Sequence, residues 1–352
     1  MSRGDRLVEL MAERELDSLL VSDLTNVRYL SGFTGTNGAC VITPEERLFL
    51  TDFRYVEQAR EQVTELERVE VGRDMLGDVA KRLRGRAGFD DEHMSVASYR
   101  KLAEKVPDGV ELVAAGGLVE RLRAVKDESE VAAMRAAAEL ATKAYESLHE
   151  HGLAGRTERE VAIQLVRLME DLGADEPSFP PIVAAGPRGA LPHAVPRDLE
   201  IPRDTLVVID MGARVDGYCS DCTRTLATGQ VADDLLESYE LVLRAQTAAL
   251  SAVTAGAECS AVDAVAREII DAAGHADHFG HGLGHGVGLE VHEAPRLGKT
   301  AEGALVVGNA VTVEPGVYLP ESFGVRIEDL VIVTEGEPDV LTGFPKELVT
   351  IG

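Results

Sequence analysis

Residues 206–227 read LVVIDMGARVDGYCSDCTRTLA, a pattern typical of two strands joined by a tight turn. The apolar run ends at Asp210, and Asp216-Gly217 is a strong signal for a two-residue hairpin turn. With that turn Asp221 pairs with Gly212, so Asp210 and Asp221 become diagonal neighbours on one face, about 7–8 Å apart at the backbone. Two solvent-facing aspartates are the alternative, but an unpaired carboxylate closing a buried run is costly. The pattern therefore favours two carboxylates that converge on shared cations.

A second pair of carboxylates lies in TVEPGVYLP (312–320) and FGVRIEDL (323–330), which contain Glu314 and Glu328. A hairpin centred on residues 320–322 would bring these two glutamates opposite each other. Like charges directly opposed on paired strands are destabilising unless something neutralises them, and a metal ion would do so. One such pair alone is more often a surface feature. Two pairs in one domain favour a metal centre.

The segment HFGHGLGHGVGLEVHE (278–293) supplies the remaining ligand candidate, His285. His281 and His285 are four residues apart, a spacing that on a helix would suggest zinc, but four glycines between 282 and 288 oppose a helix. A glycine-rich path instead lets the backbone pack close to a site while one imidazole reaches in. Four carboxylates and one histidine form an oxygen-rich set, suited to two Mn²⁺, Co²⁺ or Zn²⁺ ions.

The second part of the chain, residues 126–352, is predicted to be an α+β domain. Capping-box patterns at 127–130 (DESE) and 157–160 (TERE) precede helices expected over 131–150 and up to about 172, and further helices are expected over 233–254 and 260–273. Strands are expected over 182–185, 206–211, 218–227, 310–318 and 324–333. Helices that cover a largely antiparallel sheet give this fold class.

Residues 1–125 are predicted to form a separate, smaller α/β domain. Strand-like runs at 17–22, 38–43 and 47–51 alternate with helical spacing over 53–62 and 75–84. The segment SGFTGTNG (31–38) does not fit GxGxxG and no Lys-Ser/Thr follows, so we interpret it as a surface loop rather than a phosphate loop. A chain of 352 residues with 45% apolar content is long enough for two buried cores.

The composition of the chain limits the binding partners and the cellular compartment that we expect. A formal net charge of −26 would repel phosphate backbones and anionic lipids, so neither nucleic acid nor a membrane is expected as a partner. The N-terminus has no apolar signal region and four cysteines make no disulfide framework, so we expect a soluble, cytoplasmic protein. Cys219 and Cys222 form a CxxC; a redox pair or half a zinc site is the alternative, but the segment is strand-like and no second CxxC follows.

Taken together, these residues resemble a known family. In order and spacing, five of them are similar to the metal ligands of the M24 "pita-bread" metallopeptidases: Asp210, Asp221, His285, Glu314 and Glu328. The motifs LPHA, GLGHGVGLEVHE, TVEPGVY and GVRIED resemble the Xaa-Pro peptidase branch, aminopeptidase P and prolidase. Residues 1–125 resemble the creatinase-type N-terminal domain, which methionine aminopeptidases lack. Creatinase shares the fold without the full metal set.

The resemblance implies an enzyme that hydrolyses the bond between an N-terminal residue and proline. It implies two divalent metal ions, with manganese expected first and cobalt or zinc as alternatives, and a bridging hydroxide as nucleophile. Glu314 would be both ligand and general base, while His193 and His292 would bind the scissile carbonyl. His281 would lie near the substrate or hold a hydrogen-bonded structural position. A homodimer is also implied.

Two arginines complete the candidate site and, with His281, form the expected substrate-binding group. Arg326 lies two residues before Glu328, so both side chains should share a strand face and Arg326 could bond a ligand carboxylate. Arg296 follows VHEAP, where its guanidinium could pair with the free carboxylate of a dipeptide's proline; an exposed loop arginine is the alternative. We expect proline-containing peptides and dipeptides as substrates, since a bond to proline lacks the N–H that other peptidases use.

Two other functions remain open at this stage. One is a different metal-dependent hydrolase on the same fold, such as a methionine aminopeptidase-like enzyme. The other is a non-enzymatic protein that uses a pita-bread domain to bind peptides, because fold alone does not fix function. Five intact ligands and both accessory histidines favour the hydrolase.

Overall fold

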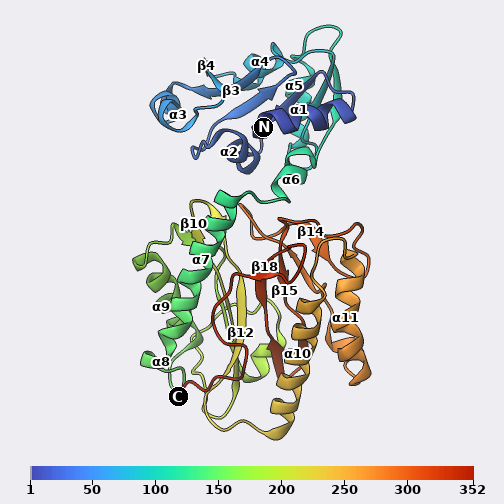
Figure 1. The fold of residues 1–352 in the computed structure, drawn as a ribbon. Helices are drawn as coiled ribbons and strands as arrows, with labels where there is room; N and C mark the ends of the chain where they lie inside the picture. Colours follow the sequence, from blue (N-terminus) through green and yellow to red (C-terminus); the bar gives the residue numbers. More distant parts are fainter. Residues whose placement is uncertain (1) are drawn as a thin grey trace. The chain divides into compact units, whose positions relative to one another are not determined.

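The structure is a computed structural model that describes residues 2–352, and the chain forms two compact units (Figure 1). The first unit ends at Arg123, and the second spans Ala124–Gly352. No helix within residues 2–352 is both long and apolar enough to cross a lipid bilayer.

The first unit is built on one mixed sheet of six strands in the order β4-β3-β2-β1-β5-β6. The strands are β1 Ser18–Val21, β2 Ala39–Ile42, β3 Arg47–Asp52, β4 Glu67–Val71, β5 Arg86–Phe89 and β6 Glu111–Ala114. The helices are α1 Arg3–Glu13, α2 Leu24–Ser31, α3 Val56–Gln62, α4 Met75–Ala80, α5 Val96–Ala103 and α6 Leu118–Arg123. Strands β1 and β2 are buried along their whole length, as their apolar sequences predict.

Two helices of this unit differ from their predicted extents. The helix predicted over 53–62 begins as a 3-10 turn, Phe53–Tyr55, because the Asp52 side chain accepts a hydrogen bond from the backbone N–H of Arg54. The helix predicted over 75–84 ends at Ala80, after which the backbone N–H groups of Arg82 and Leu83 bond three residues back. Such tightened bonds are a common way for a helix to end.

Helices form the outer layers of the second unit. They are α7 Glu128–Glu146, α8 Leu148–His151, α9 Glu158–Asp171, α10 Asp233–Ser251 and α11 Cys259–Ala272. Both predicted capping boxes are present, at Asp127 and Thr157. The single helix predicted over 131–150 is divided at Ser147, whose hydroxyl donates to the carbonyl of Ala144.

Antiparallel strands form the interior of the second unit. They are β7 Glu176–Pro177, β8 Ile182–Ala185, β9 Leu206–Met211, β10 Ala213–Val215, β11 Tyr218–Cys219, β12 Cys222–Ala227, β13 Gly284–Gly286, β14 Glu293–Leu297, β15 Ala310–Val313, β16 Gly316–Leu319, β17 Phe323–Arg326, β18 Asp329–Ile332 and β19 Asp339–Val340. Short 3-10 turns, η2 Gly186–Ala190 and η3 Ala276–His278, lie in the connecting loops.

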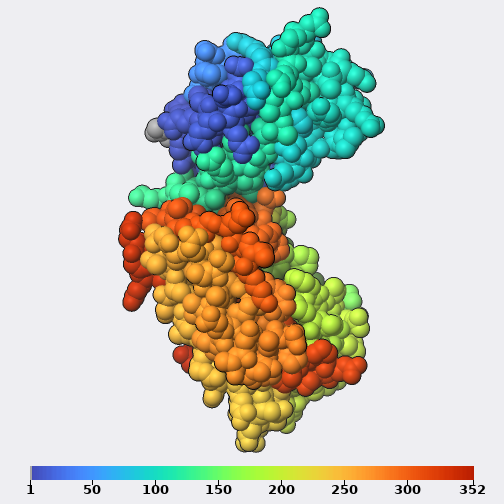
Figure 2. Space-filling view, turned by 90° about the vertical axis from the view of Figure 1, so that its right-hand side faces the viewer, coloured from blue at the N-terminus to red at the C-terminus, as the bar shows by residue number. Residues whose placement is uncertain are grey.

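Two apolar cores flank these strands. One joins α7 and α9 to β8, β9 and β12, and the other joins α10 and α11 to β15 and β17. Figure 1 shows α7 and α9 on one side of the strands and α10 and α11 on the other. Figure 2 turns the second pair toward the viewer, where gold and orange residues of α10 and α11 form the outer surface. The strands between the two helix pairs carry the candidate metal ligands.

Three predicted strands are each interrupted at a candidate ligand. The strand predicted over 218–227 breaks at Ser220 and Asp221, the one over 310–318 at Glu314 and Pro315, and the one over 324–333 at residues 327–328. The chain leaves regular pairing at these points, so each carboxylate lies between two strand segments.

Candidate metal centre and active site

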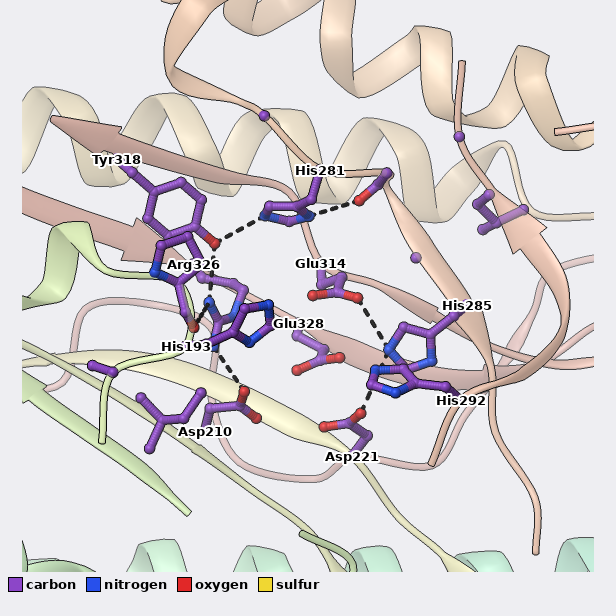
Figure 3. Close-up of a pocket in the computed structure, with 18 of the residues that line it drawn as sticks. His193, Asp210, Asp221, His281, His285, His292, Glu314, Tyr318, Arg326 and Glu328 are labelled. Atoms are coloured by element: carbon purple, nitrogen blue, oxygen red, sulfur yellow. Dashed lines mark hydrogen bonds and ion pairs between the residues drawn. The ribbon is translucent and has the colours of Figure 1, made fainter. Parts of the chain in front are cut away.

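The first hairpin has the register that its turn sequence predicts. Val215 pairs with Tyr218 next to the turn, and Asp210 pairs with Thr223 further along, so the register is unchanged across the break at Asp221. Gly212 makes this possible, since a Cβ there would lie 1.8 Å from the carbonyl oxygen of Ser220. Asp210 and Asp221 therefore belong to one ribbon and point to the same side (Figure 3).

The second hairpin opposes the two glutamates as predicted. Gly316 pairs with Arg326 and Val313 pairs with Asp329, and both pairs keep one register on either side of Glu314 and Glu328. Thr223 Oγ1 donates to Glu328 Oε2 at 2.7 Å, which connects this hairpin to the first one.

His285 completes the group from the short strand β13. Its Nε2 lies 3.2 Å from Glu314 Oε1 and 3.7 Å from Asp221 Oδ2. Ligand atoms of Asp221, His285 and Glu328 all lie within 4.8 Å of one another. Figure 3 shows the four carboxylates and this imidazole directed at a common centre. The structure therefore brings together the five residues that the sequence singled out.

The pKa values of the clustered carboxylates indicate that a positive charge is needed to keep them all ionised. Burial and the neighbouring carboxylates raise the pKa of Asp221 and of Glu328 well above the usual range. Burial also raises the pKa of Asp210, and Arg326 only partly offsets this. For Glu314 burial acts in the same direction, but the hydrogen bond and charge of His285, together with the charges of His281 and Arg326, outweigh it and lower the pKa of Glu314 to about 2.

The surroundings of one Asp210 oxygen also indicate that a cation is needed. Asp210 Oδ1 is buried and has no hydrogen-bond partner within residues 2–352. Buried carboxylate oxygens without partners are costly unless a cation or donor meets them. Four carboxylates and one imidazole fit two divalent cations in both charge and donor type.

Arg326 is the main cation among these carboxylates. Its Nη2 donates to Asp210 Oδ2 at 2.7 Å, and its Nε donates to Thr223 Oγ1 at 2.9 Å. Its Nη1 donates to the Tyr318 hydroxyl at 3.0 Å and to the carbonyl of Pro192 at 3.2 Å. The guanidinium thus holds the Asp210 carboxylate, and four of its five N–H groups are used in these bonds.

Three further histidines surround the carboxylate cluster. His281 Nε2 lies 2.9 Å from the Tyr318 hydroxyl, and His292 packs edge-on against the ring of His285 with centroids 4.3 Å apart. Burial lowers the pKa of both His281 and His292, which favours neutral imidazoles at pH 7. His193 projects toward the centre from the loop after η2 (Figure 3).

The four carboxylates, the four histidines, Tyr318 and Arg326 line one cavity of about 1250 Å³. Apolar side chains including Phe179, Ile182 and Val195 form part of its wall. Arg296 lines it as well, is exposed, and pairs across strands with His285, so both side chains stand on the same face of the sheet.

Comparison with known proteins identifies the family. Residues 132–335 match the profile of metallopeptidase family M24, and residues 3–125 match the creatinase/prolidase N-terminal domain. The chain belongs to metallopeptidase family M24. The predicted family and the predicted fold, a creatinase-type α/β domain followed by an α+β pita-bread domain, are confirmed.

The relatives of this M24 chain span its whole length. It is 36% identical to the Xaa-Pro dipeptidase of Pyrococcus furiosus over 99% of both sequences. Its structure is similar to that of an Xaa-Pro dipeptidase from Bacillus anthracis, with a TM-score of 0.96, 39% identity and 99% coverage of both chains. It is also similar to an X-Pro aminopeptidase from Thermotoga maritima, with a TM-score of 0.91, 34% identity, and coverage of 99% and 100% of the respective chains.

Sequence reasoning missed two polar residues of the M24 site. Thr223 bridges Arg326 and Glu328, and Tyr318 bridges Arg326 and His281. A signal was available for Thr223, because it lies two residues after Asp221 and pairs with Asp210 once the hairpin register is known. Tyr318 offered no comparable signal, since an aromatic residue in a buried strand is ordinarily part of the core.

The CxxC motif has a structural role in this fold. Cys219 and Cys222 are buried free thiols, and Cys222 Sγ lies 3.8 Å from the carbonyl oxygen of Glu328. Burial raises the pKa of both thiols, which opposes thiolate chemistry. Cys219 ends β11 and Cys222 begins β12, so the predicted strand is present on both sides of the motif and broken within it.

Proposed function

We propose that this chain is a dinuclear metallo-exopeptidase that hydrolyses the bond between an N-terminal residue and proline. The observation that carries the proposal is the cluster of four carboxylates and His285 that lines a large cavity, with one buried carboxylate oxygen that has no hydrogen-bond partner among the described residues. The names of the similar proteins, Xaa-Pro dipeptidases and an X-Pro aminopeptidase, support the choice of proline.

The donor set supports a site for two divalent ions, of which Mn²⁺ is the expected pair and Co²⁺ or Zn²⁺ the alternatives. The residues that would hold them are Asp210, Asp221, His285, Glu314 and Glu328. Such ions, when bound, polarise a carbonyl and lower the pKa of water to near neutrality. Arg326 and Thr223 would keep Asp210 and Glu328 in position through the hydrogen bonds described above.

Glu314 and two histidines would handle the proton and the scissile carbonyl. Glu314 is the carboxylate with the lowered pKa, so it is ionised at neutral pH and can accept a proton from the attacking water. The pKa of His292 is lowered by partial burial and by the nearby His285 and Arg296, which favours a neutral imidazole with one N–H to donate toward the carbonyl oxygen. His193 points at the same region from the opposite loop (Figure 3) and would be the second donor.

The cavity favours proline-containing peptides of more than one length. Phe179, Ile182 and Val195 provide apolar surface for a pyrrolidine ring. Arg296 can pair with the free carboxylate of a dipeptide's proline, and His281 would contact the substrate beside it. A volume of about 1250 Å³ exceeds what a dipeptide fills, so we infer a broad Xaa-Pro peptidase that also accepts dipeptides.

A matched pair of substrates tests the proposed specificity. The metal-loaded protein is assayed with Ala-Pro-Ala and Ala-Ala-Ala, and release of the first residue is measured. We expect clear preference for the proline peptide, because a bond to proline needs no N–H acceptor in the site. Equal rates, or cleavage of the alanine peptide alone, would favour a methionine aminopeptidase-like or other hydrolase.

We also infer a cytoplasmic location and a homodimer for this enzyme. Four free, buried cysteines are compatible with a reducing cytoplasm, and a homodimer is expected from family resemblance. Light scattering of the purified chain measures the oligomeric state directly.

A further inference from the structure

We propose that Glu158 and Arg188 form a clamp that positions His193 for catalysis. The His193 loop, residues 186–197, carries this histidine into the cavity, and the inference rests on the proposed function because it takes His193 to be a carbonyl-binding residue. Neither Glu158 nor Arg188 lines the cavity, so both would act through the loop.

The loop has little apolar anchoring around its functional residue. Leu191 is 51% exposed and Val195 is 73% exposed, while His193 itself is exposed. Ala194 is the buried apolar residue between them. Segments that bury few apolar contacts open easily, so a fixed position for His193 requires polar attachments.

One buried carboxylate ties together the two ends of this loop. Glu158, 1% exposed at the first position of α9, accepts hydrogen bonds from the backbone N–H of Ala185 and the backbone N–H of Arg197, each at 3.1 Å. Ala185 directly precedes the loop and Arg197 is its last residue. A single buried side chain thus connects the points where the loop begins and ends.

Arg188 extends the clamp across the loop. Its Nε donates to both oxygens of Glu158 at 3.0 Å, and its Nη2 donates to the carbonyl of Val195 at 2.7 Å. Val195 lies two residues after His193, so the guanidinium holds the second half of the loop to the first. The charge of Arg188 also balances the buried carboxylate of Glu158.

Backbone groups in the first turn of α9 also attach the end of the loop and the residues that follow it to this helix. The backbone N–H groups of Glu158 and Arg159 donate to the carbonyls of Leu199 and Arg197. On the far side, the loop is held by Arg326, which donates to the carbonyl of Pro192, and by close packing of Gly189 on Gly324. The loop around His193 is therefore held both by the clamp and by Arg326, and loss of the clamp removes the side-chain bonds to Ala185, Val195 and Arg197.

The clamp is tested by a double-mutant cycle with His193. Glu158→Gln keeps the shape of the side chain but removes the charge and puts a donor where two N–H groups point. We expect kcat for an Xaa-Pro peptide to fall about 10-fold, less than the roughly 100-fold that a misplacement of about 1 Å can cost. Metal content should stay at the wild-type value because no metal-ligand candidate touches the clamp. In a His193→Ala background, the same substitution should change kcat less than about 2-fold.

Two further variants keep the test decisive. Arg188→Lys retains the charge beside Glu158 but cannot bridge to Val195, so it should give a smaller loss of kcat with the same dependence on His193. Glu176→Gln removes the partner of Arg214 away from the cavity and should leave kcat unchanged. Deuterium uptake in peptides covering residues 186–197 should rise in both clamp variants.

The outcomes separate the clamp from the proposed function. An equal loss of kcat from Glu158→Gln with and without His193, an unchanged kcat, or a loss of bound metal would overturn the clamp alone. If His193→Ala has near-native turnover, the role of His193 in the proposed function fails and the clamp fails with it.

Discussion

At the residue scale, Thr223 connects the two carboxylate hairpins. Its hydroxyl accepts from Arg326 Nε and donates to Glu328 Oε2, so the oxygen has both a donor and an acceptor in contact. Hydrogen bonds behind a metal ligand fix its orientation and typically change metal affinity by about 10–100-fold. A residue absent from the ligand set can therefore control the ligand geometry.

Thr223→Val tests this role with almost no change in shape. We expect affinity for Mn²⁺ to fall about 10-fold, because Glu328 loses its donor and Arg326 its acceptor. Titration calorimetry of the metal-depleted protein measures the change. Thr142→Val, which removes a hydroxyl on α7 away from the cavity, should bind metal as the wild type does, and equal affinities for all three proteins would refute the role of Thr223.

Ligand and carbonyl-binding residues should fail in different ways. Asp221→Ala should lose metal from one or both positions together with activity. His292→Ala should keep its metal and turn over about 10²–10³-fold more slowly, the cost of one oxyanion-type contact. Elemental analysis beside steady-state kinetics separates the two classes. Metal loss from the His292 variant would move that residue into the ligand set.

Arg296 should distinguish dipeptides from longer substrates. Its side chain shares a sheet face with His285 and stands at the cavity wall. Arg296→Ala should raise KM for an Xaa-Pro dipeptide and spare a tripeptide, whose carboxylate lies one residue further out. Kinetics on both substrates decide; equal effects on the two, or none on either, mean that Arg296 does not bind the proline carboxylate.

At the scale of elements, the residues of the turns predicted the strand registers, whereas the predicted strand lengths did not include the breaks at three candidate ligands. The Asp216-Gly217 turn and the turn centred on residues 320–322 each fixed a register, and each register placed two carboxylates correctly. The breaks within the strands were not predictable. The periodicity of apolar residues does not reveal a local departure from strand pairing in an otherwise buried run. The contacts of Tyr318 and the Glu158 clamp depend on tertiary packing between segments distant in sequence.

The first hairpin depends on the absence of a side chain at Gly212. A Cβ at this position would lie 1.8 Å from the carbonyl oxygen of Ser220, so the two strands must separate to accept it. Gly212→Ala should destabilise the fold by about 1–3 kcal/mol and weaken metal binding, since Asp221 follows Ser220 directly. Urea unfolding measures the first and calorimetry the second.

A neutral control is available for that substitution. Gly336→Ala adds the same methyl group where no atom of residues 2–352 lies within 4 Å, and it should leave stability and metal affinity near wild type. Native stability in the Gly212 variant would show that the hairpin absorbs the extra atom without moving.

At the scale of the whole molecule, a chain of net charge −26 carries part of its acidic charge in its interior, at residues that include Asp210, Asp221 and Glu328. The raised pKa values of Asp221 and Glu328 mean that, without metal, these groups stabilise the fold in their protonated state. That contribution is present at low pH and is lost as pH rises through the raised pKa values. Bound metal would replace the missing protons.

The stabilisation by metal should therefore depend on pH. The increase in Tm on adding saturating Mn²⁺ should be larger at pH 7.5 than at pH 5, because protons compete with the metal for Asp221 and Glu328. Differential scanning fluorimetry at the two pH values measures it. An increase that is the same at both, or larger at pH 5, contradicts this account of the cluster.

The central claim, a two-metal Xaa-Pro exopeptidase, is tested most directly by titrating metal into the depleted protein. The initial rate of alanine release from Ala-Pro-Ala is measured at increasing molar ratios of Mn²⁺ under conditions of tight binding. The rate should be negligible without metal and should reach its plateau at two equivalents per chain. Full activity in the verified metal-free protein, or no cleavage of the proline peptide at any metal ratio, would contradict the claim.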